Sequence, residues 1–470
     1  MRILAIDQGT TSTKSLLVEG DGQYRLIGSR RQRQILPGPG RVEHDAAELL
    51  KHVDELLAEG VAAGAEAMAL ANQGETIVAW DRTTGVPIHN AIVWQDQRST
   101  GFVEQVRAAG HESEITERSG LPLDAYFSAS KLRWILDEVP EARRLLASGR
   151  LGLATSDAYF HERLTGRYVT DVTTAARTSL MNLESCSWDS RLCEIFGVPI
   201  DVLPEIVECD AVIGEARGIP LAAAMVDQIA ALHGHGCTLP GDAKITFGTG
   251  AFALGITTGR VSTPNVISAI AWRSPAGRVF AADGGIYTAG AAIEWLIRLG
   301  LLENVDGLGK LEGSPAASRG VYFVPALSGL GCPHWDRSAA GLWIGLDAAT
   351  GRDDLVKSVL EGVAFRAAEV LDVLGAAPNR IMSVDGGLTR CDYFLRFLAT
   401  ISQRRLTVPD IAELTAFGAA QLAAKALGEP AIGTGTSAPR QVEPENGNPQ
   451  WRALFTEARK RSSGWRQDET

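Results

Sequence analysis

Apolar runs and a polar turn alternate over roughly the first twenty residues in the way typical of a β-hairpin. Arg2–Asp7 is apolar and partly β-branched, Gln8–Thr11 has turn chemistry, and Ser15–Val18 resumes the apolar pattern. The same pattern returns at Ala243–Phe247 and Ala251–Ile256, on either side of a Gly-Thr-Gly turn. A strand–turn–strand unit that occurs twice, half a chain apart, indicates two related domains.

The segment around the start of the second hairpin contains a candidate domain boundary. Residues suitable for a hinge fall close together at Gly234, Gly236, Pro240 and Gly241. We therefore predict an N-terminal domain at residues 1–232 and a C-terminal domain at residues 233–470.

Strand and helix patterns alternate within both predicted domains. The further strands expected are Ala67–Leu70 and Thr76–Trp80. The helices expected are Ala46–Ala63, Ser128–Asp137, Glu141–Ala147 and a long helix that Asp353 and Asp354 open and that Gly375 and Pro378 end. Residues 438–449 are expected to form a surface loop before a terminal helix. This alternation favours an α/β architecture.

Charge and cysteine usage narrow the class of protein. The chain has 45 basic and 56 acidic residues, so its net charge of −11 gives no general electrostatic surface for nucleic acid or an anionic membrane. Apolar runs are too short for a membrane span, and the N-terminus is typical of a strand and not of a signal peptide. The six cysteines form no CxxC pair and are expected to be reduced thiols of a cytoplasmic protein. His233 and His235 lack further ligands nearby in sequence, which disfavours a metal site there.

The turn of the first hairpin has the chemistry of an anion site. Thr10, Thr11 and Ser12 follow Gly9 and offer hydroxyls and backbone N–H groups to a phosphate, and Asp7 could hold a metal ion through water. The turn lacks the GxxxxGK[ST] pattern of P-loop enzymes, and plain turn chemistry is the alternative.

Three other segments have a functional and an ordinary interpretation. Gly248–Gly250 is either a simple turn or a second contact to a nucleotide bound between the two domains. Asp227 follows a buried strand pattern and is either a helix N-cap or a general base for an alcohol substrate. Gly386 and Gly387 after Asp385 form either a helix-entry turn or a place where the backbone approaches adenine or ribose.

Two long segments carry a family resemblance. They are YFSASKLRWILDE at residues 126–138 and GLWIGLDAATGRDDLVKSVLE at residues 341–361, and DQGTTSTK, TDVTTAART and TFGTGAFAL lie around them. These motifs, in their order along the chain, resemble those of the FGGY carbohydrate kinase family, which includes glycerol, xylulose, ribulose and gluconate kinases. The resemblance extends over residues 2 to about 425. The segment at residues 73–95 is most similar to that of glycerol kinases. The resemblance implies an actin-like fold of two ribonuclease-H-like domains, with a cleft between them.

The resemblance also implies roles for single residues. Asp227 is implied to be the catalytic base that deprotonates a terminal hydroxyl of a small polyol or sugar, with ATP as phosphoryl donor and Mg²⁺ as cofactor. The residues implied to bind the polyol are Gly74, Glu75, Trp94, Tyr126, Asp227, Gln228 and Phe252. Those implied to bind the nucleotide are Thr10, Thr11, Ser12, Lys14, Thr249, Gly290, Glu294, Gly387 and Cys391, with Asp7 at the metal ion.

Several of these positions depart from the family pattern. Lys14 stands in place of an arginine, Glu294 in place of a glutamine, and Cys391 near a usual asparagine. Gly74 stands where glycerol kinases have an arginine beside the pocket glutamate. The absence of the arginine removes a hydrogen-bond donor and vacates volume beside Glu75. We therefore expect either that the enzyme prefers a substrate longer than glycerol or that the side chain of Arg98 reaches into the space.

Alternatives remain at the level of the sequence. The alternative to a role of Gly74 in specificity is that it is simply a turn glycine with positive φ. Glycerol is the leading substrate by similarity, and a four- or five-carbon polyol or ketose is the alternative within the same class. A non-catalytic actin-like protein that binds ATP or sugar is the alternative from another class, and the retained Asp227 argues against it. A homodimer is left open.

Overall fold

A computed structural model describes residues 1–261, 266–274, 277–433 and 439–466. The chain divides into two compact units, of which the first comprises Met1–Gly236, Ser268–Phe280 and Ile411–Thr436. The second comprises Cys237–Ile267, Ala281–Asp410 and Ser437–Thr470. The change of unit at residues 236–237 falls close to the sequence boundary at 232–233. The predicted division into residues 1–232 and 233–470 did not include the two later segments that belong to the first unit.

A six-stranded sheet forms the centre of the first unit, in the order β13-β14-β5-β1-β2-β3. The strands are β1 (Arg2–Gln8), β2 (Ser12–Glu19), β3 (Tyr24–Arg31), β5 (Ala67–Asn72), β13 (Gly214–Ala216) and β14 (Ile219–Val226). The strands β1, β5 and β14 are parallel, and Gln8 and Val226 both pair with Asn72. The carboxyl ends of these strands therefore lie at one edge.

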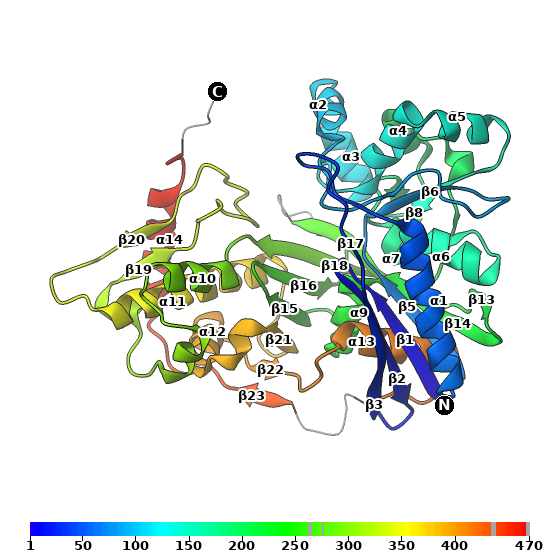
Figure 1. Cartoon of the computed structure of the whole chain (residues 1–470). Coiled ribbons are helices and arrows are strands. Elements are labelled where there is room, and N and C mark those ends of the chain that lie inside the picture. The colour runs from blue at the N-terminus through cyan, green and yellow to red at the C-terminus, as the bar shows by residue number, and fades with distance from the viewer. Residues whose placement is uncertain (262–265, 275–276, 434–438, 467–470) are drawn as a thin grey trace. The chain divides into compact units, whose positions relative to one another are not determined.

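The two faces of this sheet are covered by helices from opposite ends of the chain (Figure 1). Leu4 and Ile6 pack with residues of α1 (Ala46–Ala62), whereas Ile3 and Ala5 pack with α13 (Leu414–Ala426). This follows from the period of two along a strand, which sends successive side chains to opposite faces. Asp45 caps α1 by accepting the N–H groups of Ala47 and Glu48.

A second sheet of the first unit has the order β4-β7-β6-β8. Its strands are β4 (Glu43–His44), β7 (Ala91–Ile92), β6 (Ile77–Asp81) and β8 (Leu151–Thr155). The core below it includes residues of α4 (Ser128–Glu138) and α5 (Pro140–Ala147). The remaining elements here are α2 (Thr100–Ala108), α3 (Glu112–Ser119), α6 (Ser156–Thr165), β9 (Val169–Asp171), α7 (Val172–Ala175), β10 (Met181–Asn182), β11 (Ser187–Trp188), α8 (Ser190–Phe196), η1 (Ile200–Val202), β12 (Glu205–Val207), α9 (Asp227–Gly234) and β17 (Ile267–Ser274).

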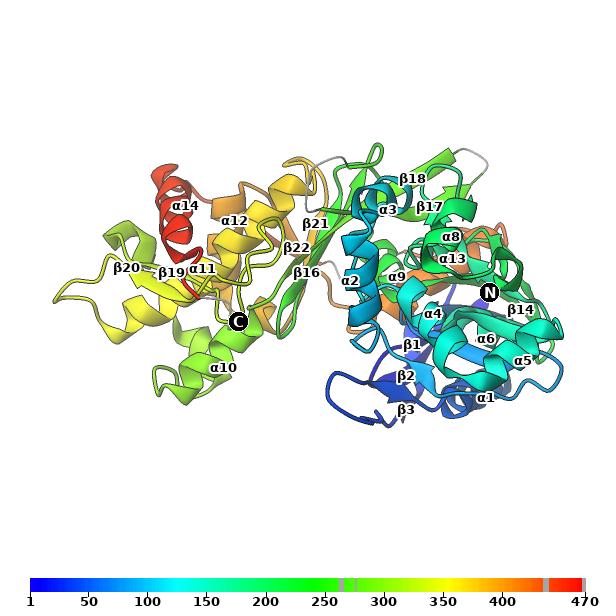
Figure 2. The same ribbon diagram turned by 90° about the horizontal axis from the view of Figure 1, so that it is seen from above.

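The second unit repeats the arrangement of the first. Its strands follow the order β18-β16-β15-β21-β22-β23, with β15 (Ala243–Phe247) antiparallel to β16 (Ala251–Thr257) and parallel to β21 (Met382–Gly386). The strand β1 has the same relation to β2 and β5. The helices α11 (Arg352–Val373) and α12 (Asp392–Ser402) lie side by side (Figure 2) and share one core with the sheet. The other elements are β18 (Gly277–Ile286), α10 (Gly290–Arg298), η2 (Val305–Lys310), η3 (Ala316–Arg319), β19 (Tyr322–Val324), β20 (Leu342–Ile344), η4 (Gly387–Arg390), β22 (Leu406–Val408), β23 (Arg440–Val442) and α14 (Gln450–Ser462).

Both predicted hairpins and the four predicted helices are confirmed, with bounds that differ by a few residues. The expected loop at residues 438–449 is partly wrong. Residue 438 lies outside the described residues, and Arg440–Val442 forms β23, which pairs with β22. Its sequence gives little indication of a strand because this edge strand is only three residues long.

Gly234 is not a hinge glycine. A Cβ at this position would run into the backbone of Leu414, and one at Gly418 would run into Ala230 and Gly234. The two glycines therefore allow α9 and α13 to pack closely within the first unit. Gly236 and Gly241 have φ values of 75° and 88°, which is ordinary turn geometry for glycine.

Three other features bear on class. All six cysteines lie within the described residues, where they are buried and form no disulfide. Among the described residues, no helix is long and apolar enough to cross a membrane. The same residues contain no group of three or more His, Cys, Asp or Glu side chains arranged to hold a metal ion.

Candidate functional site

The carboxyl ends of β1, β5 and β14 gather the acidic residues singled out in the sequence. Asp7 lies at the end of β1, Glu75 follows β5, and Asp227 follows β14 directly. The shared register of Gln8, Asn72 and Val226 places these three chain ends at one edge of the sheet. In open α/β sheets this edge is where ligands bind.

Asp7 lies in an unusual electrostatic environment. Burial, and then the nearby carboxylates of Asp227 and Glu413, raise the pKa of Asp7 to about 8, and Lys14 opposes the shift. Its Oδ1 is buried without a hydrogen-bond partner. A buried oxygen of this kind fits a carboxylate that holds a hydrated cation, since oxygen and water are the ligands that Mg²⁺ prefers.

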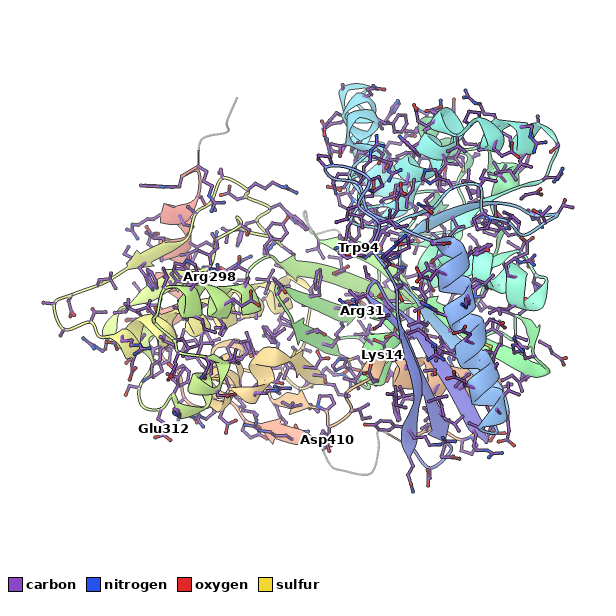
Figure 3. The ribbon with its side chains drawn as sticks, viewed as in Figure 1. Lys14, Arg31, Trp94, Arg298, Glu312 and Asp410 are labelled. Atoms are coloured by element: carbon purple, nitrogen blue, oxygen red, sulfur yellow. The ribbon has the colours of Figure 1, made fainter. Side chains whose placement is uncertain are left out.

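The predicted phosphate turn lies between β1 and β2. Thr11 is exposed, Thr10 and Ser12 are half-buried, and Gly9 closes the turn by donating its N–H to the Ser12 carbonyl over 3.1 Å. Lys14 projects from β2 (Figure 3), and its Nζ lies 2.7 Å from Oε1 of Glu413, the residue before α13. The turn thus presents hydroxyls and one partly exposed cation.

Glu75 is held in a conformation that non-glycine residues rarely adopt. Its φ is 59°, and Thr76 N–H donates to the Gly74 carbonyl over 2.7 Å, so the chain turns sharply here. Ser128 Oγ donates to the Glu75 carbonyl over 3.1 Å. The Glu75 side chain is buried and accepts a hydrogen bond from Arg177 Nε over 2.5 Å. Strain of this kind is concentrated at functional sites, and here it fixes the direction of a buried carboxylate.

Trp94 links the predicted polyol residues to the phosphate turn. Its ring contacts Tyr126 edge to face, with centroids 5.5 Å apart, and its Nε1 donates to Thr10 Oγ1 over 3.0 Å. Its backbone N–H donates to Thr76 Oγ1 over 3.3 Å. Glu75, Trp94, Tyr126 and Thr10 are therefore parts of one connected cluster within the first unit.

Asp227 is not the N-cap of α9. Val226 is the N-cap residue, and Asp227 is the first residue of the helix. Its Oδ1 accepts the N–H of Gln228 over 2.6 Å, and both side chains are half-buried. Thr173 Oγ1 accepts the N–H of Val226 over 2.9 Å, which fixes the backbone just before Asp227. These two hydrogen bonds fix the backbone and the carboxylate of Asp227 at the carboxyl end of β14.

The structure at Gly74 agrees neither with a turn glycine of positive φ nor with an open space that Arg98 enters. Gly74 is not among the residues with positive φ. A Cβ there would lie 2.7 Å from Val226 Cγ2 and 3.9 Å from Arg177 Cγ, so the position next to the backbone is filled. Arg98 does not reach it, because its side chain is buried in ion pairs with Asp96 and Glu43. The cation found beside Glu75 is Arg177.

In the second unit, three predicted nucleotide residues lie on neighbouring segments. Ala289 and Ala291 donate their N–H groups to the carbonyl of Thr249, and Gly290 donates to Gly248 over 2.9 Å. Phe247 and Gly386 pair across parallel strands, which brings Gly387 to the same edge as the turn. A Cβ at Gly387 would meet nothing within 4 Å, so the backbone there is open to approach by a ligand.

The remaining predicted residues of the second unit differ from one another. Phe252 and Glu294 are exposed, on β16 and α10 respectively. Cys391 departs from the prediction because its thiol is buried and donates to the Leu308 carbonyl over 3.4 Å. Burial raises the pKa of this thiol. Its side chain packs in the core and is not presented to a nucleotide.

Comparison with known proteins decides the family. The N-terminal domain model of the FGGY family of carbohydrate kinases matches residues 2–234, and the C-terminal domain model matches residues 243–427. The chain belongs to the FGGY family of carbohydrate kinases. As an FGGY kinase it is an ATP-dependent carbohydrate or polyol kinase of actin-like, two-domain fold.

Relatives with known names agree with this assignment. The FGGY kinase is 40% identical over 446 residues to a glycerol kinase of Koribacter versatilis, which covers 91% of this chain and 90% of that protein. It is 37% identical to a glycerol kinase of Nitratidesulfovibrio vulgaris, covering 98% and 99%. A structure of Plasmodium falciparum glycerol kinase with ADP superimposes with a TM-score of 0.90 at 28% identity, covering 98% of each chain. A Lactobacillus acidophilus xylulose kinase, at 21% identity and TM-score 0.83, shares the fold.

Two residues of the site were missed in the sequence. Arg177 lies within TDVTTAART, a segment noted only as a family motif. Glu413 is 399 residues away from Lys14, and nothing local in the sequence connects the two. The place of Arg177 inside a family motif was a usable signal in the sequence. No comparable signal pointed to Glu413.

Proposed function

We propose that this FGGY kinase transfers the γ-phosphoryl group of ATP to a terminal hydroxyl of glycerol. The observation that supports this most strongly is the connected cluster at the carboxyl ends of β1, β5 and β14. It joins a buried carboxylate and two aromatic rings to the phosphate turn through the Trp94–Thr10 hydrogen bond, and the predicted base Asp227 follows β14 at the same edge of the sheet. The glycerol kinases among its relatives support glycerol as the substrate.

Each residue of the cluster has a role in this proposal. Asp227 accepts the proton of the hydroxyl as phosphoryl transfer proceeds. Glu75 accepts hydrogen bonds from other hydroxyls, and the rings of Trp94 and Tyr126 pack against the carbon chain. Bound MgATP supplies the phosphoryl group and the cation that offsets its charge. Thr10, Thr11, Ser12 and Lys14 bind the phosphates, and Thr249, Gly290 and Gly387 the rest of the nucleotide, while Asp7 holds the hydrated Mg²⁺. The buried thiols and the need for ATP support a cytoplasmic location.

A four- or five-carbon polyol or ketose is the second candidate. Gly74 favours it in the sequence, because a missing arginine vacates volume. The filled space beside Gly74 favours glycerol instead.

A coupled ADP-release assay over glycerol, tetritols, pentitols and ketoses tests the proposal. We expect glycerol to give the highest kcat/KM. A higher value for a longer polyol would assign the second candidate, and no ADP release with any of them would contradict the proposed reaction.

Restoring an arginine at position 74 should damage the enzyme. We expect Gly74→Arg to lower kcat/KM for glycerol about 100-fold, because the new Cβ displaces Val226, the neighbour of Asp227, and small misplacements of reacting groups are costly. Steady-state kinetics with glycerol and a pentitol measure this. Adding Val226→Ala should recover part of the loss, whereas a gain for glycerol over the pentitol in Gly74→Arg alone would show that residue 74 opens the pocket.

Lys14 should serve the nucleotide and not the polyol. We expect Lys14→Ala to raise the KM for ATP about tenfold or more and to change the KM for glycerol little, since hydrogen bonds to charged groups are the strong ones. Glu413→Gln is the matched control because it breaks the same ion pair and keeps the cation. Equal changes in the two variants would mean that the ion pair, and not phosphate binding, is what matters.

A further inference from the structure

Arg31 is an exposed arginine beside the phosphate turn. It is the last residue of β3, the edge strand of the first sheet, and it pairs across the sheet with Ser12. The next residue, Gln32, donates its N–H to the carbonyl of Thr11 over 3.2 Å. The β-carbons of directly paired residues on antiparallel strands lie about 5 Å apart. The side chain of Arg31 therefore begins next to a hydroxyl of the turn.

Arg31 leaves the same face of the sheet as Lys14. Ser12 and Lys14 are alternate residues of β2, so they share a face, and the cross-strand partner of Ser12 shares it too. This is the face covered by α13, because Lys14 forms an ion pair with Glu413, the residue before that helix. Figure 3 shows Lys14 and Arg31 on these two neighbouring strands.

The preceding arginine has a different environment. Arg30 leaves the opposite face of the sheet, where it forms ion pairs with Glu55 and Glu59 of α1. Among the residues that the structure describes, the guanidinium of Arg31 has no carboxylate partner. Two adjacent arginines thus differ: the charge of one is offset by the helix beneath it, and the charge of the other is not.

The other charges around the turn make this cation important for an anionic ligand. The Nζ of Lys14 lies 2.7 Å from Oε1 of Glu413, so a carboxylate already offsets the lysine charge. The carboxylates of Asp227 and Glu413 are close enough to Asp7 to raise its pKa, and they would repel a phosphate as well. Since the phosphate chain of ATP carries several negative charges, Arg31 supplies the positive charge that these carboxylates do not cancel.

We propose that Arg31 is a second phosphate-binding cation of the nucleotide site, whose guanidinium binds the phosphate chain of ATP together with Lys14 and the turn. This inference rests on the proposed binding of ATP at the turn. A guanidinium is permanently charged, and its planar fork of N–H donors matches two phosphate oxygens at once. Because Arg31 contributes to binding and not to proton transfer, its loss should raise the KM for ATP more than it lowers kcat.

Equilibrium titration of the full chain with MgATP, in the absence of polyol, tests the contact. Arg31→Gln should raise the Kd for ATP about tenfold at low ionic strength, as expected for the loss of hydrogen bonds to a charged group. The difference from wild type should shrink as salt is added, because exposed charges are screened. Arg31→Lys keeps the charge and should recover part of the affinity. An unchanged Kd in Arg31→Gln, or a lysine variant that binds ATP as weakly as the glutamine variant, would overturn the proposal.

Arg30→Gln is the matched control. It removes the same charge from the adjacent residue of the same strand, but on the face that α1 covers. It should leave the Kd for ATP within about twofold of wild type, because general charge effects at this distance are weak and screened. An equal rise in both variants would show a general effect of lost charge and would also overturn the proposal. Wild type that binds ATP but phosphorylates no polyol would contradict the proposed function and leave this test intact.

Discussion

Asp227→Asn should lower kcat about 10²- to 10⁴-fold and leave the affinity for ATP within a few-fold. An amide fills the space of the carboxylate but cannot accept the proton of the substrate hydroxyl, and general-base loss typically has this cost. Single-turnover ADP release measures the chemical step, and nucleotide titration measures binding. The fold should tolerate the change, since Val226 and not Asp227 is the N-cap of α9.

Asp54→Asn is the matched control for this variant. Asp54 belongs to the same unit, and its half-exposed carboxylate pairs with Arg217 on the surface. It should leave kcat near the wild-type value. Near-normal kcat in Asp227→Asn would remove this residue from the mechanism, and equal losses in both variants would point to a general effect of lost charge.

Asp7→Asn should weaken Mg²⁺-dependent activity and stabilise the free protein. The pKa of Asp7 is raised from 3.8 to about 8, so the folded chain retains a proton that the unfolded chain loses. Stability from this group is therefore fully present below about pH 4 and is lost as the pH rises toward 8. An uncharged asparagine removes that loss, and the Tm at pH 8 should rise by several degrees.

Thermal unfolding at a series of pH values checks the sign. Wild type and Asp7→Asn should have similar Tm values near pH 4 and diverge toward pH 8. The concentration of Mg²⁺ that half-saturates activity should rise about 10- to 100-fold in the variant. Parallel Tm curves would mean that Asp7 is charged in the folded protein at neutral pH.

The sequence predicts what depends on local pattern. The hairpins at residues 2–19 and 243–257 follow from apolar runs around turn residues, and α1 follows from its apolar stripe and Asp45 cap. The site residues at the ends of β1 and β14 are predictable in the same way, because a polar residue directly after a buried strand is visible in the sequence.

What depends on long-range packing is not predictable in this way. The Gly234–Gly418 contact joins α9 to a helix almost two hundred residues later, so the glycine resembles a hinge until its neighbour is known. Cys391 matches a family position, yet its thiol packs in the core. At position 74, the sequence shows a missing side chain, but only the structure shows that Val226 and Arg177 occupy the space.

The place of α13 has a consequence for how the chain is made. One face of the N-terminal sheet, with Ile3, Ala5 and Leu16, is covered by Phe417 and its neighbours on that helix. Most of the second unit, residues 281–410, is synthesised before α13 leaves the ribosome. During that time the apolar face stays uncovered, and nascent chains with such surfaces are prone to aggregate. The first unit can therefore complete its folding only late in translation, and expression of residues 1–236 alone would give a fragment with this face exposed to solvent.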